Sequence, residues 1–77
     1  MDVRVINKDG ELVNVTNMSM RVMGNILVGY NVEQNLTTVA RCESEKEARG
    51  VLEVIIGRIK RNVKGNVVVD LREGKER

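Results

Sequence analysis

The hydrophobic pattern of this 77-residue chain changes its period once, near residue 43. Before that point apolar and polar residues mostly alternate, as in half-buried β-strands, and Val3 to Ile6 is the first such run. After it, apolar residues recur every three or four positions, which indicates an amphipathic helix. A last apolar run from Val67 to Leu71 predicts one more strand. The residues predicted for the core-facing side of the helix are Ala48, Val51, Leu52, Ile55, Ile56, Ile59 and Val63.

The helix has recognisable start and stop signals. Ser44-Glu45-Lys46-Glu47 is a capping box, because the Ser44 hydroxyl can accept from the third helical N–H and the Glu47 carboxylate can reach back. We therefore expect the helix to begin at Ser44. Gly65-Asn66 predicts its end.

Three turn signals divide the residues before the helix. Asp9-Gly10 favours a two-residue type I′ turn, and Gly24-Asn25 is compatible with a type II′ turn. Gln34-Asn35 marks the third turn. The strands predicted in this part of the chain are 3–6, 12–15, 18–23, 26–32 and 36–42.

These elements predict an α+β fold. We expect a mostly antiparallel sheet of about five strands, in ββββαβ order, with one amphipathic helix packed on one face. Residues 1–71 form a single domain in this interpretation, and residues 72–77 form a charged tail that frays. A domain of this size, with one Tyr and no Phe or Trp, has little core, so self-association would add buried surface.

Composition argues against catalysis. The chain contains no His and only Cys42, so it offers no internal disulfide and no Cys/His metal site. No phosphate-binding Gly-rich loop precedes the helix. Asp70 and Glu73, an acidic pair near the carboxyl end, have no His beside them. We expect no enzyme activity, no cofactor and no metal. Cys42 is expected to be a reduced, small apolar residue.

Charge and hydropathy restrict the location. The chain has 13 cationic and 11 anionic side chains, interleaved, which gives only weak steering of anions. It has no apolar run long enough to span a membrane and no signal-type apolar stretch at the amino terminus. We therefore expect a cytoplasmic protein without a membrane partner.

A possible ligand site lies on the predicted sheet. If the second and third turns are two-residue loops, Arg21, Val28 and Arg41 share one cross-strand row, and Tyr30 faces Val39 in the next. A Tyr beside two Arg can stack a base and hold a phosphate or carboxylate. A register shift would instead leave the arginines merely solvated. The predicted ligand-binding residues are Arg21, Tyr30 and Arg41, with Asn25 and Asn31 as polar supplements.

Two surfaces are candidates for self-association. The outward sheet face carries more apolar residues than a small monomer normally exposes. On the helix, Gly50, Val54, Gly57 and Arg61 follow a heptad-like 4, 3, 4 spacing along which a second helix could approach. Simple tolerance of glycine is the alternative explanation of that line. The predicted oligomer interface residues are Ile26, Val28, Val39, Gly50, Val54 and Gly57.

A basic cluster ends the helix. Arg58, Lys60, Arg61 and Lys64 could neutralise nucleic-acid phosphates. Cations are also favoured at a helix carboxyl end by the macrodipole, which explains the cluster without a ligand. Single-strand binders add several stacking aromatics, and this chain has only Tyr30.

The overall pattern resembles small proteins of phages and prophages of Gram-positive bacteria. The resemblance rests on Val3-Arg4-Val5-Ile6 through Asp9-Gly10, on the hairpin around Met23-Gly24-Asn25-Ile26, and on the segment from Ala40 to Ala48. It contains no diagnostic motif, so no functional residue carries over. Several such proteins inhibit host defence, either by binding an effector nuclease or as oligomeric sponges for nucleotide signals. The resemblance thus implies a non-catalytic antagonist.

Three functions follow as hypotheses. The first is a homo-oligomeric, phage-type protein that antagonises a bacterial defence in the host cytoplasm by sequestering an anionic nucleotide signal or a host defence protein. The second is a small nucleic-acid-binding accessory protein that uses the basic cluster. The third is a purely structural subunit.

Overall fold

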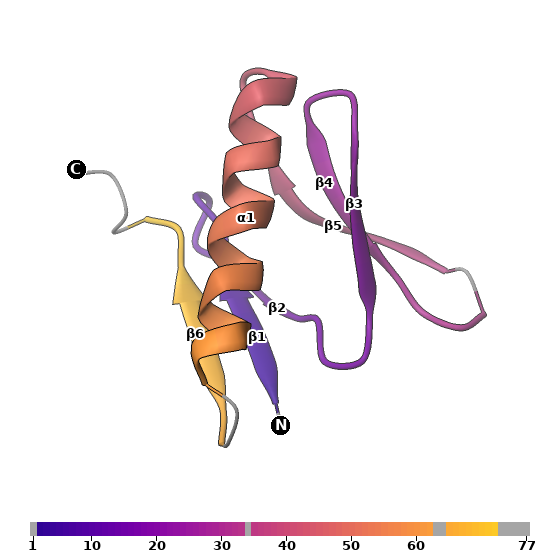
Figure 1. Ribbon diagram of the computed structural model, residues 1–77. Helices are drawn as coiled ribbons and strands as arrows, with labels where there is room; N and C mark the ends of the chain where they lie inside the picture. The colour runs from indigo at the N-terminus through magenta and orange to yellow at the C-terminus, as the bar shows by residue number, and fades with distance from the viewer. Residues whose placement is uncertain (1, 34, 63–64, 73–77) are drawn as a thin grey trace.

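The computed structural model describes residues 2–33, 35–62 and 65–72, and its α+β class confirms the prediction (Figure 1). Within these residues, five strands precede a single helix and one follows it. The elements are β1 (Val3–Ile6), β2 (Leu12–Asn14), β3 (Ser19–Met23), β4 (Ile26–Tyr30), β5 (Leu36–Arg41), α1 (Glu45–Arg61) and β6 (Val67–Asp70).

The strands are divided between two three-stranded sheets. In the first, β1 lies between an antiparallel β2 and a parallel β6, and in the second β3, β4 and β5 form an antiparallel meander. A turn at residues 15–18 separates the sheets: Asn17 adopts a φ of 62°, and Met18 N donates to Val15 O at 3.1 Å. This turn redirects the chain, so β3 does not continue the first sheet beside β2.

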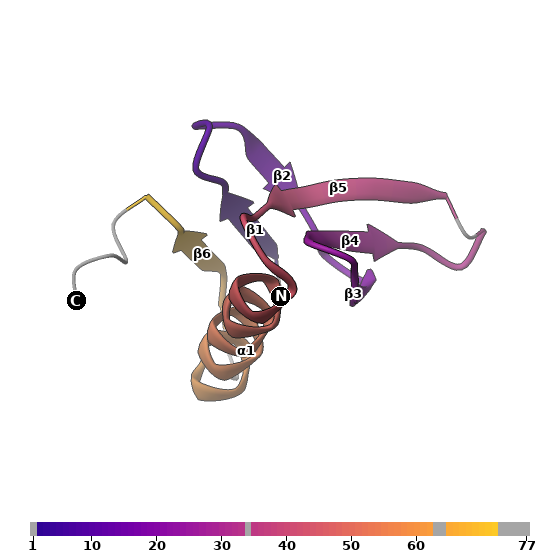
Figure 2. The ribbon, with the colours of Figure 1, turned by 90° about the horizontal axis from the view of Figure 1, so that it is seen from above.

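The helix packs against both sheets. It contacts β3 and β4 on one side and β6 on the other. Figure 2 views the helix along its axis, with the two groups of strands on either side of it. Ile55 and Ala48 on the helix are fully buried, whereas Ile56, predicted to face the core, is 39% exposed. Val63 lies outside the described residues. The other core residues are Val3, Val5, Val15, Leu27, Val39, Ala40, Cys42, Val67, Val69 and Leu71.

The predicted Ser44 cap is present, but the Glu47 carboxylate reaches back to the N–H of Glu43 rather than to that of Ser44. Glu47 N donates to Ser44 Oγ, and Glu43 N donates to Glu47 Oε1, both at 3.1 Å. The other Glu47 oxygen accepts from Lys8 Nζ in the β1–β2 turn, so the cap also ties the helix to the first sheet. The hydrogen bond from Lys8 lowers the pKa of Glu47, and the same bond raises the pKa of Lys8.

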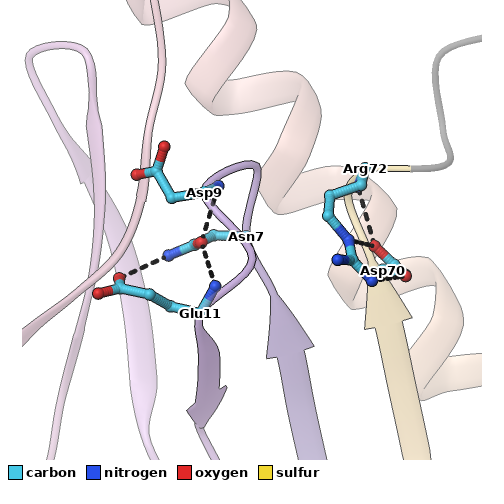
Figure 3. Close-up of polar contacts among 5 residues, drawn as sticks. All are labelled: Asn7, Asp9, Glu11, Asp70 and Arg72. Atoms are coloured by element: carbon cyan, nitrogen blue, oxygen red, sulfur yellow. Dashed lines mark hydrogen bonds and ion pairs between the residues drawn. The ribbon is translucent and has the colours of Figure 1, made fainter.

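One buried amide organises the β1–β2 turn and joins it to the second sheet. Asn7 Oδ1 accepts from Asp9 N and Glu11 N at 3.0 Å, and Nδ2 donates to Glu11 Oε1 at 3.1 Å and to Val39 O at 3.3 Å (Figure 3). Asn7 N also donates to Glu11 O, so these two residues close the hairpin. The loop therefore has three residues, ending on Gly10 at a φ of 87°, and the prediction of a two-residue turn is wrong.

The predicted tail begins with an anchored residue. Arg72 N and Nε donate to Asp70 Oδ1, and Arg72 Nη2 donates to Asp70 Oδ2, each at 3.0 Å (Figure 3). Arg72, the first residue of the predicted tail, is thus hydrogen-bonded to the end of β6. Residues 73–77 lie outside the described part of the chain.

We predict that Asn7→Ala lowers the free energy of unfolding by about 2–3 kcal/mol, because it leaves two backbone donors and one backbone acceptor without their partner. Asn14→Ala is the matched control, since its exposed amide accepts one hydrogen bond, from Thr16 N. That control should lose less than about 1 kcal/mol. Urea denaturation measures both values, and an equal loss in the two variants would contradict the role assigned to Asn7.

We predict that Glu47→Gln destabilises the protein at neutral pH but not in acid. The pKa of Glu47 in the folded state lies below its ordinary value of 4.5, so its ionised form stabilises the fold above that value. This stabilisation fades as the pH falls through the lowered folded-state pKa. Melting temperatures of wild type and Glu47→Gln should therefore converge between about pH 5 and pH 2. A difference that stays constant over this range would argue against the Lys8–Glu47 contribution.

Candidate ligand-binding face of the second sheet

The outer face of the β3–β4–β5 sheet starts with the hairpin of β3 and β4. Met23 pairs with Ile26 and Arg21 with Val28, as the two-residue loop at Gly24-Asn25 predicts. Gly24 adopts a φ of 64° in that loop. Because side chains alternate along a strand, Arg21 and Met23 share one exposed side of β3.

The pairing of β4 with β5 differs from the prediction. Tyr30 pairs with Leu36 and Ile26 with Arg41, and the register shifts between them at a β-bulge. The loop before β5 spans residues 31–35 rather than two residues. Asn31 Oδ1 stabilises it by accepting from Glu33 N at 2.9 Å and from Asn35 N at 3.1 Å. A side chain that bonds its own backbone in this way favours a longer turn than the sequence spacing suggested.

Two of the predicted ligand-binding residues come together. Tyr30 lies opposite Ser19, and Arg21 follows two residues later on the same side of β3, which makes Arg21 and Tyr30 diagonal neighbours. A shallow hollow of about 310 Å³ lies at this place, lined by Arg21, Met23, Tyr30 and Leu36. Arg21 is exposed and has no ion pair with any described residue.

Arg41 does not join them. It lies beside Ile26, four residues along β4 from Tyr30, which is a separation of roughly 13 Å. The predicted row of Arg21, Val28 and Arg41, and the pairing of Tyr30 with Val39, are therefore wrong. The bulge and the five-residue loop shift β5 by two to three positions relative to the expected register.

The two asparagines serve the fold. Asn25 Nδ2 donates to Cys42 O at 2.7 Å, and Cys42 N donates to Asn25 O at 2.9 Å, so the β3–β4 turn holds the segment that leads into α1. Asn31 shapes the loop before β5. Both side-chain amides thus have structural roles in the turns where they occur.

Sequence reasoning missed two lining residues. Met23 alternates with Arg21 on β3, so its position on this face was available from the period of two. Leu36 reached the hollow only through the longer loop, which no pattern in the sequence specifies.

Part of the predicted sheet interface belongs to the monomer. Val39 is fully buried in the core, because the bulge turns it toward the helix side, and its placement on the outward face is wrong. Val28 keeps the outward side but is only 7% exposed between its strand partners Arg21 and Thr38. Ile26 is half-buried.

The predicted helix line is open. Val54 is 52% exposed, and a Cβ added at Gly50 or Gly57 would meet no other atom within 4 Å. The structure thus leaves room for a second helix along this side of α1.

The basic cluster is divided by its contacts. Arg58 Nη2 donates to Val68 O at 3.1 Å and so is committed to β6. Lys60 and Arg61 are exposed, and Lys64 lies outside the described residues. The described part of the cluster therefore offers two cations rather than a continuous basic surface.

The acidic pair and the thiol considered for catalysis or metal binding are described only in part. Arg72 lowers the pKa of Asp70, which keeps this carboxylate ionised, and Glu73 lies outside the described residues. Burial raises the pKa of the Cys42 thiol. Among the described residues there is no cluster of metal-ligating side chains, and no helix there has the length and apolar character needed to cross a membrane.

Comparison of the chain with protein-family models, with curated proteins and with solved structures finds no match.

Proposed function

We propose that this chain is a non-catalytic binding protein that captures a nucleotide or a similar ring-bearing anion on the outer face of the β3–β4–β5 sheet. One observation carries the proposal: Arg21 and Tyr30, from neighbouring strands, line the same hollow together with Met23 and Leu36. The site thus combines a cation, an aromatic ring and two flexible apolar side chains within one shallow depression.

Each of these groups has a role in the proposed binding. The Arg21 guanidinium has no partner among the described ion pairs, so its donors are available to a phosphate in bidentate geometry. The Tyr30 ring offers a surface on which a base can stack. Met23 and Leu36 would make apolar contacts with the edges of that base. Since the net charge is only +2, affinity would come from these contacts rather than from long-range attraction.

The biological setting that we propose is antagonism of a bacterial host defence. The resemblance to small phage proteins supports a sequestering role in the host cytoplasm, with a nucleotide signal as the ligand. A host defence protein that docks on the same face is the alternative target within this proposal.

We predict that Arg21→Ala and Tyr30→Leu each weaken nucleotide binding about tenfold or more. A charge-assisted hydrogen bond contributes about 1.5–3 kcal/mol and a stacked base about 1–3 kcal/mol. Isothermal titration with AMP, ADP and ATP measures the affinities of wild type and variants. Arg49→Ala is the control, because Arg49 is an exposed cation of α1 that pairs with Glu45.

Two results would contradict this proposal. If none of the nucleotides perturbs the amide resonances of β3 and β4, the face does not bind this class of ligand. If a single-stranded oligonucleotide binds instead and Arg61→Glu abolishes that binding, the second hypothesis, nucleic-acid binding by the helix end, takes its place.

We also propose that the protein is a homo-oligomer assembled through the outer side of α1. Gly50 and Gly57 each cost about 1 kcal/mol relative to Ala in an exposed helix, and both leave space for a neighbouring backbone. Exposed Val54 between them supplies apolar contact. The sheet face is less suited to this role, because Val28 and Val39 are buried within the monomer.

We predict that Gly57→Leu dissociates the oligomer to a mass near 8.7 kDa without lowering the stability of the monomer. A Cβ added at Gly57 meets no atom within 4 Å outside the local helix backbone, and leucine raises helix propensity, but its side chain would fill the space that a second helix would use. Arg49→Leu is the control, since Arg49 lies about 100° around the helix axis from Gly50. Light scattering distinguishes the outcomes, and a monomeric wild type would refute self-association while leaving the nucleotide proposal standing.

A further inference from the structure

A second depression lies where the two sheets approach each other. It has a volume of about 560 Å³ and is separate from the hollow at Arg21. One wall comes from β2 and the other from β5, and each of these is the last strand of its sheet in the described part of the chain. The lining residues are Glu11, Leu12, Val13, Asn14, Met18, Thr37 and Thr38.

The β2 wall presents unpaired backbone groups. Asn7 N donates to Glu11 O, and Val15 N donates to Val3 O at 2.9 Å, so the hydrogen-bonded pairs of this ladder fall on odd-numbered residues of β2 and its flanks. In an antiparallel ladder the intervening residues direct their N–H and C=O groups away from the partner strand. Leu12 and Asn14 therefore offer two donors and two acceptors at the free edge.

The β5 wall turns its edge toward the same place. The carbonyl of Val39 points away from β4, because it accepts from Asn7 Nδ2 of the first sheet at 3.3 Å. The two residues that precede Val39, Thr37 and Thr38, line the depression on the β5 side. Two strand edges thus lie on either side of one open space.

We propose that this depression binds an extended segment of a partner protein, which adds a strand to the edge of β2 beneath β5. An extended residue in a sheet occupies about 160 Å³, from its rise, the strand spacing and the sheet thickness. The volume of the depression therefore accommodates about three residues. Peptides that extend a sheet in this way are recognised mainly through main-chain hydrogen bonds, with alternate side chains giving specificity.

The lining defines the chemistry of that segment. Val13 and Met18 are partly buried apolar residues that pack against the core, so side chains directed inward should be apolar at alternate positions. Glu11 is the single charged residue among the described residues of the lining, which favours a Lys or Arg in the partner near the β1–β2 turn. A helix would leave the edge groups of Leu12 and Asn14 unpaired. Because we assign self-association to the outer side of α1, we assign this site to a different protein.

The edge of β6 differs in a way that supports this assignment. Arg58 Nη2 donates to Val68 O, and so covers an acceptor that β6 would otherwise present. Charged side chains commonly protect strand edges from unwanted pairing. No comparable side chain covers the backbone groups of Leu12 among the described hydrogen bonds.

The test uses the folded protein and a displayed library of random ten-residue peptides. We expect the enriched peptides to alternate apolar residues and to carry a Lys or Arg, and a synthetic copy should protect the Leu12 and Asn14 amides from hydrogen exchange. Leu12→Pro should weaken its binding at least tenfold by removing an edge donor. Val68→Pro is the matched control, because Val68 is also an exposed strand residue and its N–H lies at the other edge of the same sheet.

A second variant tests the same site without a proline, in case Leu12→Pro does not fold. Thr38→Arg narrows the depression from the β5 wall without changing a backbone donor, and it should weaken the same peptide to a similar degree. Retained binding in both variants, or peptides that bind as helices, would overturn the proposal. Protection of Leu12 and Asn14 that rises with the concentration of the protein alone would assign the site to a second copy instead. Leu12→Pro should still bind nucleotides as the wild type does, because Leu12 does not line the hollow at Arg21. A nucleotide titration of this variant therefore distinguishes failure of this proposal from failure of the nucleotide proposal.

Discussion

The arrangement of the two sheets depends on the hydrogen bonds of the Asn7 side chain. This side chain uses both of its polar atoms: the oxygen sets the β1–β2 loop, and the nitrogen bonds Glu11 and the Val39 carbonyl. Because the amide is buried, these bonds cannot be exchanged for bonds to water without cost. One residue thus fixes a hairpin register and holds β5 against the first sheet.

The division into two sheets explains how a chain with so little aromatic surface encloses a core. Each sheet turns its Val and Leu side chains toward α1, whose Ile55 and Ala48 fill the space between them. Residues of modest size then suffice, because two sheets and one helix enclose the core together. The same division leaves separate outer surfaces: the face of β3–β4–β5 with Arg21 and Tyr30, the open side of α1, and the depression between β2 and β5. These surfaces are the places where our proposals put a ligand, a second copy and a partner peptide.

Local signals predicted the elements well and their long-range pairing less well. The cap at Ser44 and the turn at Gly24-Asn25 act over a few residues, and both are present as expected. The register of β5 depended on the loop at Asn31 and on a bulge near Val39. The alternation of side chains along β4 and β5 is the same whether the loop between them has two residues or five. The sequence therefore could not place Arg41 relative to Tyr30. The diagonal of Arg21 and Tyr30 was predictable because it needs only the short β3–β4 hairpin.

By itself, the sequence determined the class of fold, the order of strands and helix, the start of α1 and the side of β3 that carries Arg21. These features depend on side-chain periodicity and on bonds between near neighbours in the chain. Only the tertiary structure decided that β6 pairs in parallel with β1, that Val39 belongs to the core, and that Arg58 is committed to Val68. Each of these outcomes depends on contacts between residues far apart in the chain or on a bulge that shifts the pleat, and neither leaves a periodic trace in the sequence.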